Sequence, residues 1–349
     1  MASILVEGPG AIQLIQEIVS IKSSRSLMDF PDDRLVLGRV NGEDGEEIVV
    51  RRHNPQSIEL HCHGGYAAAA MIEEILRQRG CRIVAWRQWI DEISEDPIAA
   101  AAQIALADAP TGRTAAILLD QYHGALGRAL DSIQQDIEGK NFTSARRQVE
   151  SLLGNIPLGL HLTKPWRVVA AGPPNAGKSS LINALVGYQR SIVHHTPGTT
   201  RDAVTETTAM DGWPVELCDT AGLNAEARGI EKAGVELARR RISDADLTVL
   251  VFDLTVNWSA SDQTLIESFP NALLVHNKVD LPHTLDNRPM GLHTSALDGV
   301  GIDTLIEKIA VRLVPAPPPP GAAVPFTSEQ VEQAKRIIGI LKSNHVSIR

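Results

Sequence analysis

The hydrophobic pattern of residues 3–87 predicts a small domain of mixed strands and helices. Apolar runs of strand length and apolar positions at helical spacing follow one another along it. The expected strands cover 4–6, 35–40, 48–51, 58–62 and 82–86, and the expected helices cover 10–19 and 66–79. The turn-forming string Asn41-Gly42-Glu43-Asp44-Gly45 separates two of these strands. We therefore expect an α+β domain over residues 1–90.

Helical spacing of apolar positions replaces this pattern after Pro97. One helix of about seven turns is expected, then a break at Gly139-Lys140-Asn141 and a further helix that Gly154 ends. The expected helices cover 115–137 and 142–154. They predict an α-helical domain over 91–160. We interpret its apolar stripe as the core of a helical hairpin rather than as a cofactor pocket.

Strands and helices alternate from 164 to 314, which is typical of an α/β domain with a mostly parallel sheet. The expected strands include 168–171, 215–218, 247–252 and 273–276. Asp211-Gly212 is a hairpin signal directly before the second of these, so one strand is expected to be antiparallel. The expected fold class is therefore multi-domain, with an α+β, an α-helical and an α/β domain.

Two segments follow the α/β pattern. The proline-rich stretch 315–326 predicts an extended, semi-rigid linker because proline cannot continue a helix. Thr327 and Gln330 have the spacing of a capping box, so a last helix is expected to begin at Thr327, within a segment over 327–349.

Composition excludes several classes of protein. The 349 residues carry a formal net charge of -9, which argues against general electrostatic attraction to nucleic acid or to an anionic membrane. Any RNA contact is then local or shared with a partner. The three cysteines, Cys62, Cys81 and Cys218, lie far apart in sequence, which argues against a disulfide framework or a zinc site. The N-terminus has no signal-peptide pattern and no apolar run approaches a membrane span, so we expect a cytoplasmic protein without membrane association.

The most informative stretch is 172–179, which matches the phosphate-loop pattern of Gly, four free positions and Gly-Lys-Ser. It lies between an apolar run and a helix that Gly187 is expected to end. Lys178 would supply charge for the outer phosphates, and Ser179 a hydroxyl for Mg²⁺. Taken alone, the motif also fits a chance glycine-rich turn. The nucleotide-binding residues that it predicts are Gly172, Asn175, Ala176, Gly177, Lys178, Ser179 and Ser180.

Two later motifs predict groups that respond to a γ-phosphate. In the hydroxyl-rich loop 196–202, Thr200, rather than Thr199, is expected to close on Mg²⁺. In the next motif, Asp219 is expected to hold Mg²⁺ through water, and the Gly222 amide to sense the phosphate. The residues that we place in the site from these motifs are Thr199, Thr200, Asp219, Thr220, Ala221 and Gly222.

Two last motifs predict recognition of guanine. Asp280, in Asn277-Lys278-Val279-Asp280, can accept hydrogen bonds from the guanine ring N–H and its exocyclic amine, which adenine cannot both offer. At about 1.5–3 kcal/mol each, two charge-assisted bonds would select GTP. The backbone of Ser295 and Ala296 is expected to read the guanine carbonyl. Five motifs in this order at strand ends predict a GTP-binding P-loop domain, to which Asn277 and Lys278 also contribute.

The sequence resembles the TrmE/MnmE family of tRNA modification GTPases in its most specific motifs. These motifs are Pro-Asn-Ala-Gly-Lys-Ser (174–179), Pro-Gly-Thr-Thr-Arg-Asp (197–202), Asp-Thr-Ala-Gly-Leu (219–223) and the N-terminal Glu-Leu-His-Cys-His-Gly-Gly (59–65). The likeness covers most of 3–312. It implies a P-loop GTPase domain behind an α+β and a helical domain, GTP hydrolysis with Mg²⁺, and a role in tRNA wobble-uridine modification.

The resemblance also implies how hydrolysis is activated. Ras-like GTPases position the attacking water with a glutamine at the place that Leu223 occupies here. The family instead uses potassium-dependent dimerisation of two GTPase domains, which assigns K⁺ binding to Asn175 and catalysis to Glu231, Lys178 and Asn175. A cation beside the phosphates can stabilise transition-state charge as an arginine finger does. From the residues alone, we would interpret Asn175 as an ordinary turn residue and Glu231 as a solvated helix charge.

The family's partners are implied in the same way: a homodimer, a flavoprotein of the MnmG type, tRNA bound through the complex, and formyl-tetrahydrofolate on the N-terminal domain. His61, Cys62 and His63 offer only two ligands on one face and no nearby carboxylate cluster, so zinc is not expected. We interpret these residues as structural or as lining the folate pocket.

The sequence departs from the family near its C-terminal end. The family ends in Cys-x-Gly-Lys, whereas residues 344–349 read Asn-His-Val-Ser-Ile-Arg and no cysteine follows Cys218. An alternative function is therefore a divergent regulatory switch GTPase, related to the ribosome or to RNA, without modification activity. A third class, a structural module that binds nucleotide without hydrolysing it, also remains open.

Overall fold

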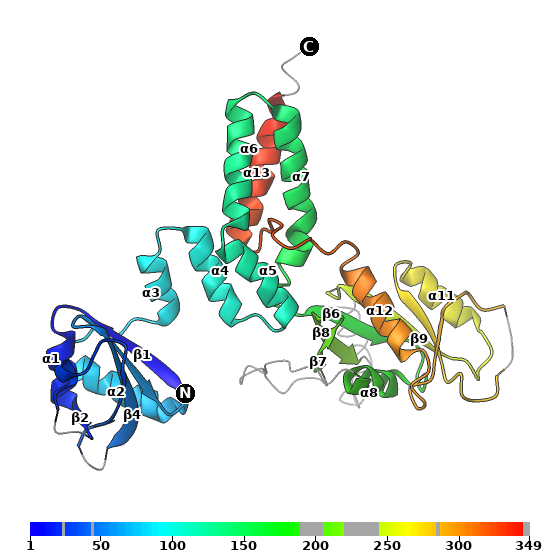
Figure 1. Cartoon of the computed structure of the whole chain (residues 1–349). Coiled ribbons are helices and arrows are strands. Elements are labelled where there is room, and N and C mark those ends of the chain that lie inside the picture. Colours follow the sequence, from blue (N-terminus) through cyan, green and yellow to red (C-terminus); the bar gives the residue numbers. More distant parts are fainter. Residues whose placement is uncertain (23–24, 43–44, 189–204, 220–243, 284–286, 345–349) are drawn as a thin grey trace. The chain divides into compact units, whose positions relative to one another are not determined.

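The computed structural model describes residues 1–22, 25–42, 45–188, 205–219, 244–283 and 287–344. The chain forms two compact units, Met1–Trp89 and Ile90–Arg349, which are described separately (Figure 1). The division of the second unit into a helical and a GTPase domain, with the boundaries expected above, remains a prediction.

The first unit contains an antiparallel sheet with two helices packed against it. Its described residues form five strands in the order β1-β5-β4-β3-β2. The strands are β1 (Ala2–Glu7), β2 (Val19–Ile21), β3 (Leu35–Val40), β4 (Glu46–Asn54) and β5 (Ser57–Cys62), and the helices are α1 (Ala11–Ile18), α2 (Tyr66–Gln78) and the short 3-10 helix η1 (Leu27–Asp29). Alternate strand residues such as Val50, Ile58 and Leu60 pack against Ile15 and Ile72 in one core. Four of the five expected strands are therefore present, as β1, β3, β4 and β5.

The expected strand over 82–86 is wrong. Residues 81–85 belong to no helix or strand, and helix α3 (Trp86–Ile93) begins at Trp86 and spans the boundary of the two units. A short apolar run fits a strand or a helix equally well by pattern. Ile83 is exposed, so the run has no buried face that would favour pairing with the sheet. Trp89 Nε1 instead donates to Glu7 Oε2 on β1 at 3.1 Å.

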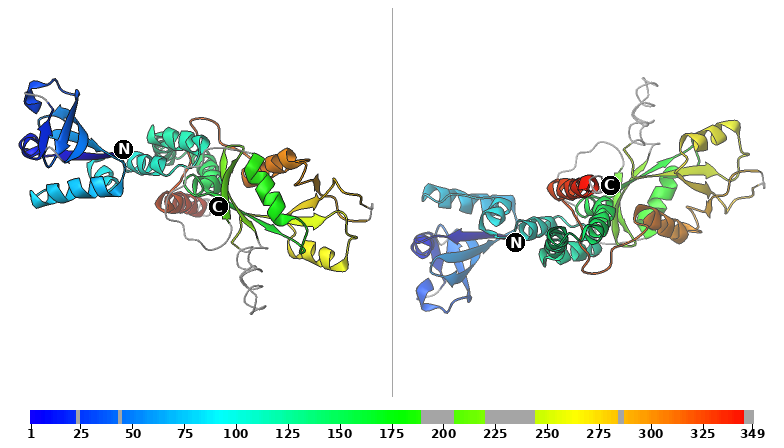
Figure 2. Two further views of the ribbon diagram at one scale, coloured as in Figure 1. Left: turned by 90° about the horizontal axis from the view of Figure 1, so that it is seen from below. Right: turned by 90° about the horizontal axis from the view of Figure 1, so that it is seen from above.

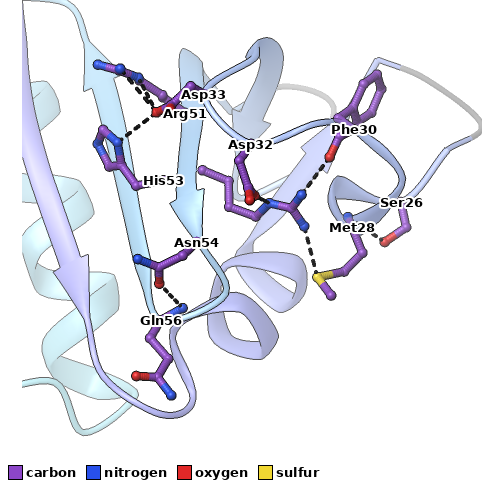
Figure 3. A network of polar contacts seen from close by, with 10 residues as sticks. Ser26, Met28, Phe30, Asp32, Asp33, Arg51, His53, Asn54 and Gln56 are labelled. Carbon is purple, nitrogen blue, oxygen red and sulfur yellow. Dashed lines mark hydrogen bonds and ion pairs between the residues drawn. The ribbon is translucent and has the colours of Figure 1, made fainter.

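A buried arginine fixes the segment between β2 and β3 (Figure 3). Arg52 on β4 pairs through Nε with Asp32 Oδ1 at 2.9 Å and donates from Nη2 to Phe30 O at 2.6 Å and from Nη1 to Met28 Sδ at 3.2 Å. On the opposite face of β4, Arg51 Nε and His53 Nδ1 contact Asp33 Oδ1 at 3.1 and 2.9 Å. Because strand side chains alternate, adjacent residues of β4 hold this segment from two sides.

The helical part of the second unit differs from its prediction in two helix boundaries. The helices are α4 (Pro97–Ala107), α5 (Gly112–Tyr122), α6 (Ala125–Glu138), α7 (Phe142–Gly159) and, from the C-terminal segment, α13 (Ser328–Asn344). The single helix of seven turns is in fact α5 and α6, because Gly124 has a φ of 84° and interrupts the helical path. Gly154 does not end α7, which continues past Pro157 to Gly159. Gly154 is not in the left-handed region that a helix-ending glycine adopts.

Helices α6, α7 and α13 lie side by side and share one core (Figure 1). Its buried residues are Leu126, Ile133, Ala145, Val149, Leu152, Ile338 and Leu341. The apolar stripe is thus a packing surface, as predicted, but its core is formed by three helices rather than by the two of a hairpin. The capping box at the start of that helix is confirmed, since Gln330 N donates to Thr327 Oγ1 at 3.3 Å and Thr327 N to Gln330 Oε1 at 3.1 Å.

The proline-rich linker has no helix or strand, as predicted, but side chains of the helical part hold its end, 321–325. Gln121 on α5 donates from Nε2 to Ala322 O at 3.0 Å and accepts from Val324 N at 3.1 Å. Asn155 on α7 donates to Ala323 O at 2.9 Å. Val324 is fully buried. We call residues 321–325 the strap.

The second unit also contains a mixed sheet. Its described residues form six strands in the order β11-β10-β9-β6-β8-β7, of which only the β7–β8 pair is antiparallel. The elements are β6 (Trp166–Ala171), α8 (Lys178–Tyr188), β7 (Thr205–Met210), β8 (Trp213–Asp219), β9 (Leu247–Asp253), α11 (Ala260–Ser268), β10 (Leu273–Asn277), β11 (Leu292–Thr294) and α12 (Ile302–Leu313). The predicted mostly parallel sheet with one antiparallel strand is confirmed. Asp211 and Gly212 form the hairpin turn with φ of 49° and 76°.

Helices cover both faces of this sheet. Helices α8 and α12 lie side by side and pack on the large core that includes Val168, Val249 and Val275 (Figures 1 and 2). On the other face, Leu265 and Ile266 of α11 pack on Phe252. Helix α8 includes Gly187 and its described part runs to Tyr188, so the expected end at Gly187 is wrong. Strands enclosed on both faces explain the continuous apolar runs in the sequence.

Candidate functional site

The candidate site lies at the edge of the mixed sheet where the parallel strands end. Ala170 on β6 is level with Asp219 on β8, and Asn277 on β10 is level with Asp253 on β9 and Thr294 on β11. Parallel strands bring their carboxyl ends to a common edge, where ligands of open α/β sheets bind. Polar residues that are far apart in sequence therefore meet here.

The phosphate loop between β6 and α8 has a backbone that requires its unusual residues. Gly172 has a φ of 142°, and a Cβ there would lie 2.1 Å from Val251 O. Gly177 has a φ of 89°, and its Cβ would lie 2.3 Å from Asn277 Nδ2. Asn175 also has a positive φ, 63°, a conformation that asparagine tolerates better than most residues. The two glycines are thus needed for close packing against β9 and β10.

Lys178 is the first residue of α8 and is only 6% exposed. Its Nζ donates to Gly172 O at 3.1 Å and to Pro173 O at 2.8 Å. Burial lowers the pKa of this ammonium, and the nearby Asp219 carboxylate partly opposes the shift. A buried cation held by two loop carbonyls is well placed to meet an anion that enters the loop.

Ser179 and Asp219 come together at the ends of α8 and β8. Ser179 Oγ donates to Asp219 Oδ2, and the Asp219 side chain is buried. A hydroxyl and a carboxylate in contact beside the loop are hard oxygen donors of the kind that Mg²⁺ prefers. The two predicted Mg²⁺ residues that the structure describes are therefore adjacent, and they fit the metal.

Asn277 joins three of the predicted motifs. Its Nδ2 donates to Ala176 O in the phosphate loop at 3.1 Å. Its Oδ1 accepts from Thr294 Oγ1 at 3.1 Å and from Ala296 N at 3.2 Å. The side chain is buried, so these bonds are shielded from water. Asn277 thus holds the phosphate loop and the 294–296 loop in one arrangement.

The residues expected to read the base differ in exposure. Asp280 is exposed and lies three residues after the end of β10. Ser295 is fully buried and its Oγ accepts from Asp298 N at 3.0 Å, so its side chain shapes the loop. The Ala296 amide donates to Asn277. Of the predicted phosphate-loop residues, Ser180 is exposed on α8 and Ala176 is buried.

Two site residues were missed by sequence reasoning. Asp253 ends β9 and its Oδ2 pairs with Lys278 Nζ at 2.6 Å. Thr294 directly precedes Ser295, and its Oγ1 donates to Asn277 Oδ1 at 3.1 Å, a bond that the sequence did not predict. The signal for Asp253 was an acidic residue directly after the apolar run 247–252, at the same position in its strand as Asp219 in the strand before.

Several predicted residues lie outside the part of the chain that the structure describes. They are Thr199, Thr200, Thr220, Ala221, Gly222, Leu223 and Glu231. Their assignment remains a prediction.

The N-terminal motif 59–65 is held by hydrogen bonds within the first unit. His61 Nδ1 lies 2.8 Å from Ser3 Oγ, and His63 Nδ1 lies 2.6 Å from Glu46 Oε1. Cys62 is buried, and burial raises the pKa of its thiol. Within the described residues, no group of three or more His, Cys, Asp or Glu side chains is arranged to hold a metal ion.

Comparison with known proteins identifies the family. Residues 167–278 match the family model of the 50S ribosome-binding GTPase. The tRNA modification GTPase MnmE of Synechococcus sp. (strain WH7803) is 30% identical over 364 residues, covering 89% of this chain and 78% of that protein. The chain belongs to the MnmE family.

A second MnmE sequence agrees with this assignment. The MnmE of Prochlorococcus marinus (strain MIT 9303) is 29% identical, covering 88% of this chain and 77% of that protein, so membership of the MnmE family extends over both units. The G domain of the FeoB iron transporter of T. maritima is 30% identical over 42% of this chain and 98% of its own length, with a TM-score of 0.33. No helix among the described residues is long and apolar enough to cross a membrane.

Proposed function

We propose that this member of the MnmE family binds GTP at the edge formed by β6, β8, β9 and β10 and hydrolyses it to drive conformational change in tRNA wobble-uridine modification. The observation that supports this most directly is the buried Lys178, held by loop carbonyls next to the Ser179–Asp219 pair. Phosphate loop, metal oxygens and base-reading motif share one edge. That arrangement suits a nucleoside triphosphate.

Each described residue has a role in this proposal. Lys178 binds the outer phosphates, and the loop amides around Gly177 bind the phosphate oxygens. Ser179 and Asp219, with Thr200, would hold Mg²⁺, which neutralises charge on the phosphates when bound. Asp280 binds the guanine ring. Asn277 keeps the phosphate loop and the 294–296 loop in register.

Hydrolysis is proposed to depend on K⁺ and on a second GTPase domain. Leu223 has no group that can orient water, so another group must do so. Asn175 is assigned to K⁺ and Glu231 to water activation, following the resemblance of their motifs to the family. Of these two residues, only Asn175 lies in the part of the chain that the structure describes. It is in the turn of the phosphate loop and has a φ of 63°.

The biological setting is proposed from the family. The chain would act in the cytoplasm as a homodimer, with a flavoprotein partner of the MnmG type that supplies redox chemistry and with tRNA bound through the complex. Formyl-tetrahydrofolate is the proposed ligand of the first unit, with His61 and His63 near its site. Relatives named as tRNA modification GTPases support this setting.

The decisive measurement is GTP turnover by the full chain in K⁺ against Na⁺ at equal ionic strength. We expect turnover in K⁺ to be at least about 10-fold faster, and Glu231→Ala to lose about 10²- to 10⁴-fold in K⁺, the range for a lost general base. Glu307→Ala, on the exposed face of α12, is the matched control and should keep the wild-type rate. Equal rates in the two cations, or full activity of Glu231→Ala, would exclude this activation mechanism.

Asp280→Asn should change base preference from guanine toward xanthine. The amide replaces a double acceptor with one acceptor and one donor, and the donor complements the xanthine 2-oxo group. We expect GTP affinity to fall by about 10- to 150-fold, equivalent to one charge-assisted bond. Competition between GTP and XTP for a fluorescent nucleotide measures this, with exposed Asp303→Asn as the control. Unaltered selectivity would remove Asp280 from the base site.

A second candidate function is a regulatory switch that recruits a ribosomal or RNA partner without modifying tRNA. The observation in its favour is that residues 167–278 match the model of a ribosome-binding GTPase. Mass spectrometry of tRNA nucleosides from a deletion strain separates the two functions. Loss of the modified wobble uridine supports the first, and an unchanged tRNA profile supports the switch.

A further inference from the structure

The side chain of Lys278 connects the end of β9 to the phosphate loop. Lys278 Nζ pairs with Asp253 Oδ2 at 2.6 Å and also donates to the backbone carbonyl of Asn175 at 2.8 Å. The ammonium therefore lies between a carboxylate and the loop. Because the two partners are on different segments, Lys278 fixes the distance between them.

Asp253 is built to hold that ammonium in place. Its side chain is only 14% exposed, and its Oδ1 accepts from Thr255 N at 2.9 Å and from Thr255 Oγ1 at 2.7 Å. Burial raises the pKa of this carboxyl, but the hydrogen bonds from Lys278 and Thr255 outweigh burial, so its pKa lies below the ordinary value. Asp253 is thus a charged group with both oxygens engaged, one of them on the lysine.

Asn175 and Lys278 both have backbone conformations that are unusual for residues other than glycine. Asn175 has a φ of 63° and Lys278 has a φ of 70°, and neither is a glycine. Left-handed residues of this kind persist where surrounding contacts hold them. The bond from Lys278 Nζ to the Asn175 backbone carbonyl is such a contact.

We propose that Asp253 is a positioning residue for GTP hydrolysis, which acts through Lys278 to hold Asn175 in the conformation that receives the nucleotide and its monovalent cation. This inference rests on the proposed function for the role of Asn175. In this proposal Asp253 contacts Lys278 and Thr255 and needs no contact of its own with phosphate or base. Its effect is exerted on the loop before the nucleotide arrives, as preorganisation.

The structure predicts a graded effect of substitution. Asp253→Ala removes the acceptor, whereas Asp253→Asn keeps one oxygen for Lys278 and should partly restore function. We expect the Kd for a fluorescent GDP to rise about 10-fold for alanine and about 3-fold for asparagine. The K⁺ concentration for half-maximal turnover should rise by at least about 5-fold for alanine. Turnover at saturating GTP and K⁺ should stay within about 2-fold of wild type, because no group in contact with the nucleotide has been removed.

The test uses the full chain and a double-mutant cycle. Lys278→Met keeps the aliphatic stem but removes the charge, so Asp253→Ala should add little to its effect on Kd. Glu216→Gln is the matched control, since Glu216 forms an ion pair with Arg167 in the same sheet at 3.1 Å, away from the nucleotide edge. It should leave Kd and the K⁺ requirement unchanged.

Two outcomes would overturn the proposal. One is a lower melting temperature for Asp253→Ala with unchanged Kd and K⁺ requirement, which would assign Asp253 to stability alone. The other is additive effects of Asp253→Ala and Lys278→Met on Kd. If the wild type shows no stimulation by K⁺, the cation part of the proposed function fails, and the Kd cycle then decides the role of Asp253 by itself.

Discussion

Lys178→Ala is expected to weaken GTP and GDP binding by about 10²- to 10⁴-fold. Each charge-assisted hydrogen bond contributes about 1.5–3 kcal/mol, and the ammonium can serve two phosphate oxygens. Lys178 is buried, which lowers its pKa, so part of its desolvation has already occurred in the free protein. The charge can therefore bind an anion without losing many more waters.

The experiment is a titration of fluorescent GDP and GTP by the full chain, with Lys308→Ala on the exposed face of α12 as the matched control. The control should bind as wild type. Thermal unfolding without nucleotide shows that the variant is folded, while nucleotide should raise the melting temperature of wild type and control only. A folded Lys178→Ala protein with wild-type affinity would place the nucleotide elsewhere.

Gln121→Leu is expected to destabilise the second unit by about 2–6 kcal/mol. Gln121 is fully buried on α5 and makes three bonds, to Ile117 O at 2.9 Å, to Ala322 O at 3.0 Å and from Val324 N at 3.1 Å. Leucine has a similar volume, so no large cavity forms. The carbonyl and the amide of the strap nevertheless lose their partners, at about 1–3 kcal/mol for each unpaired group.

A loss of this size should lower the melting temperature by about 4–24 °C, given about 2–4 °C per kcal/mol for a unit of this length. Nucleotide affinity should be unchanged, because the strap is not part of the nucleotide edge. Gln134→Leu is the matched control, since Gln134 on α6 is exposed and bonds only to Glu138 among the contacts described. An unchanged melting temperature for Gln121→Leu would show that water replaces the lost bonds.

The sequence pattern predicted local structure correctly where that structure depends on one short segment. Three predicted features depend only on neighbouring residues, and each is present. They are the hairpin at Asp211-Gly212, the capping box of Thr327 and Gln330, and four of the expected strands of the first unit. The mixed sheet could be predicted for the same reason: long apolar strands indicate burial on both faces, and a hairpin signal indicates one antiparallel pair.

Local pattern failed where two conformations share one pattern. Gly124 interrupts a helix and Gly154 does not, although both are glycines within helical spacing. The difference is one of backbone conformation: Gly124 has a φ of 84°, whereas Gly154 is not left-handed and α7 continues to Gly159. Gly159 lies against the strap, where a Cβ would be 1.8 Å from Pro325 O. The run 82–86 failed similarly, since nothing local separates a short strand from the start of a helix.

The sequence by itself determined that a phosphate loop, a base-reading motif and the motifs between them occur in the order of a GTPase, because each is a short string. Tertiary structure alone decided which side chains hold that site. Asn277 bonds to Ala176 across 101 residues, and Lys278 bonds to Asn175 across 103. Such contacts depend on strand order and register in the sheet, which bring the ends of β9 and β10 against the loop. The pairing of Asp253 with Lys278, 25 residues away, is set in the same way by the parallel register of β9 and β10.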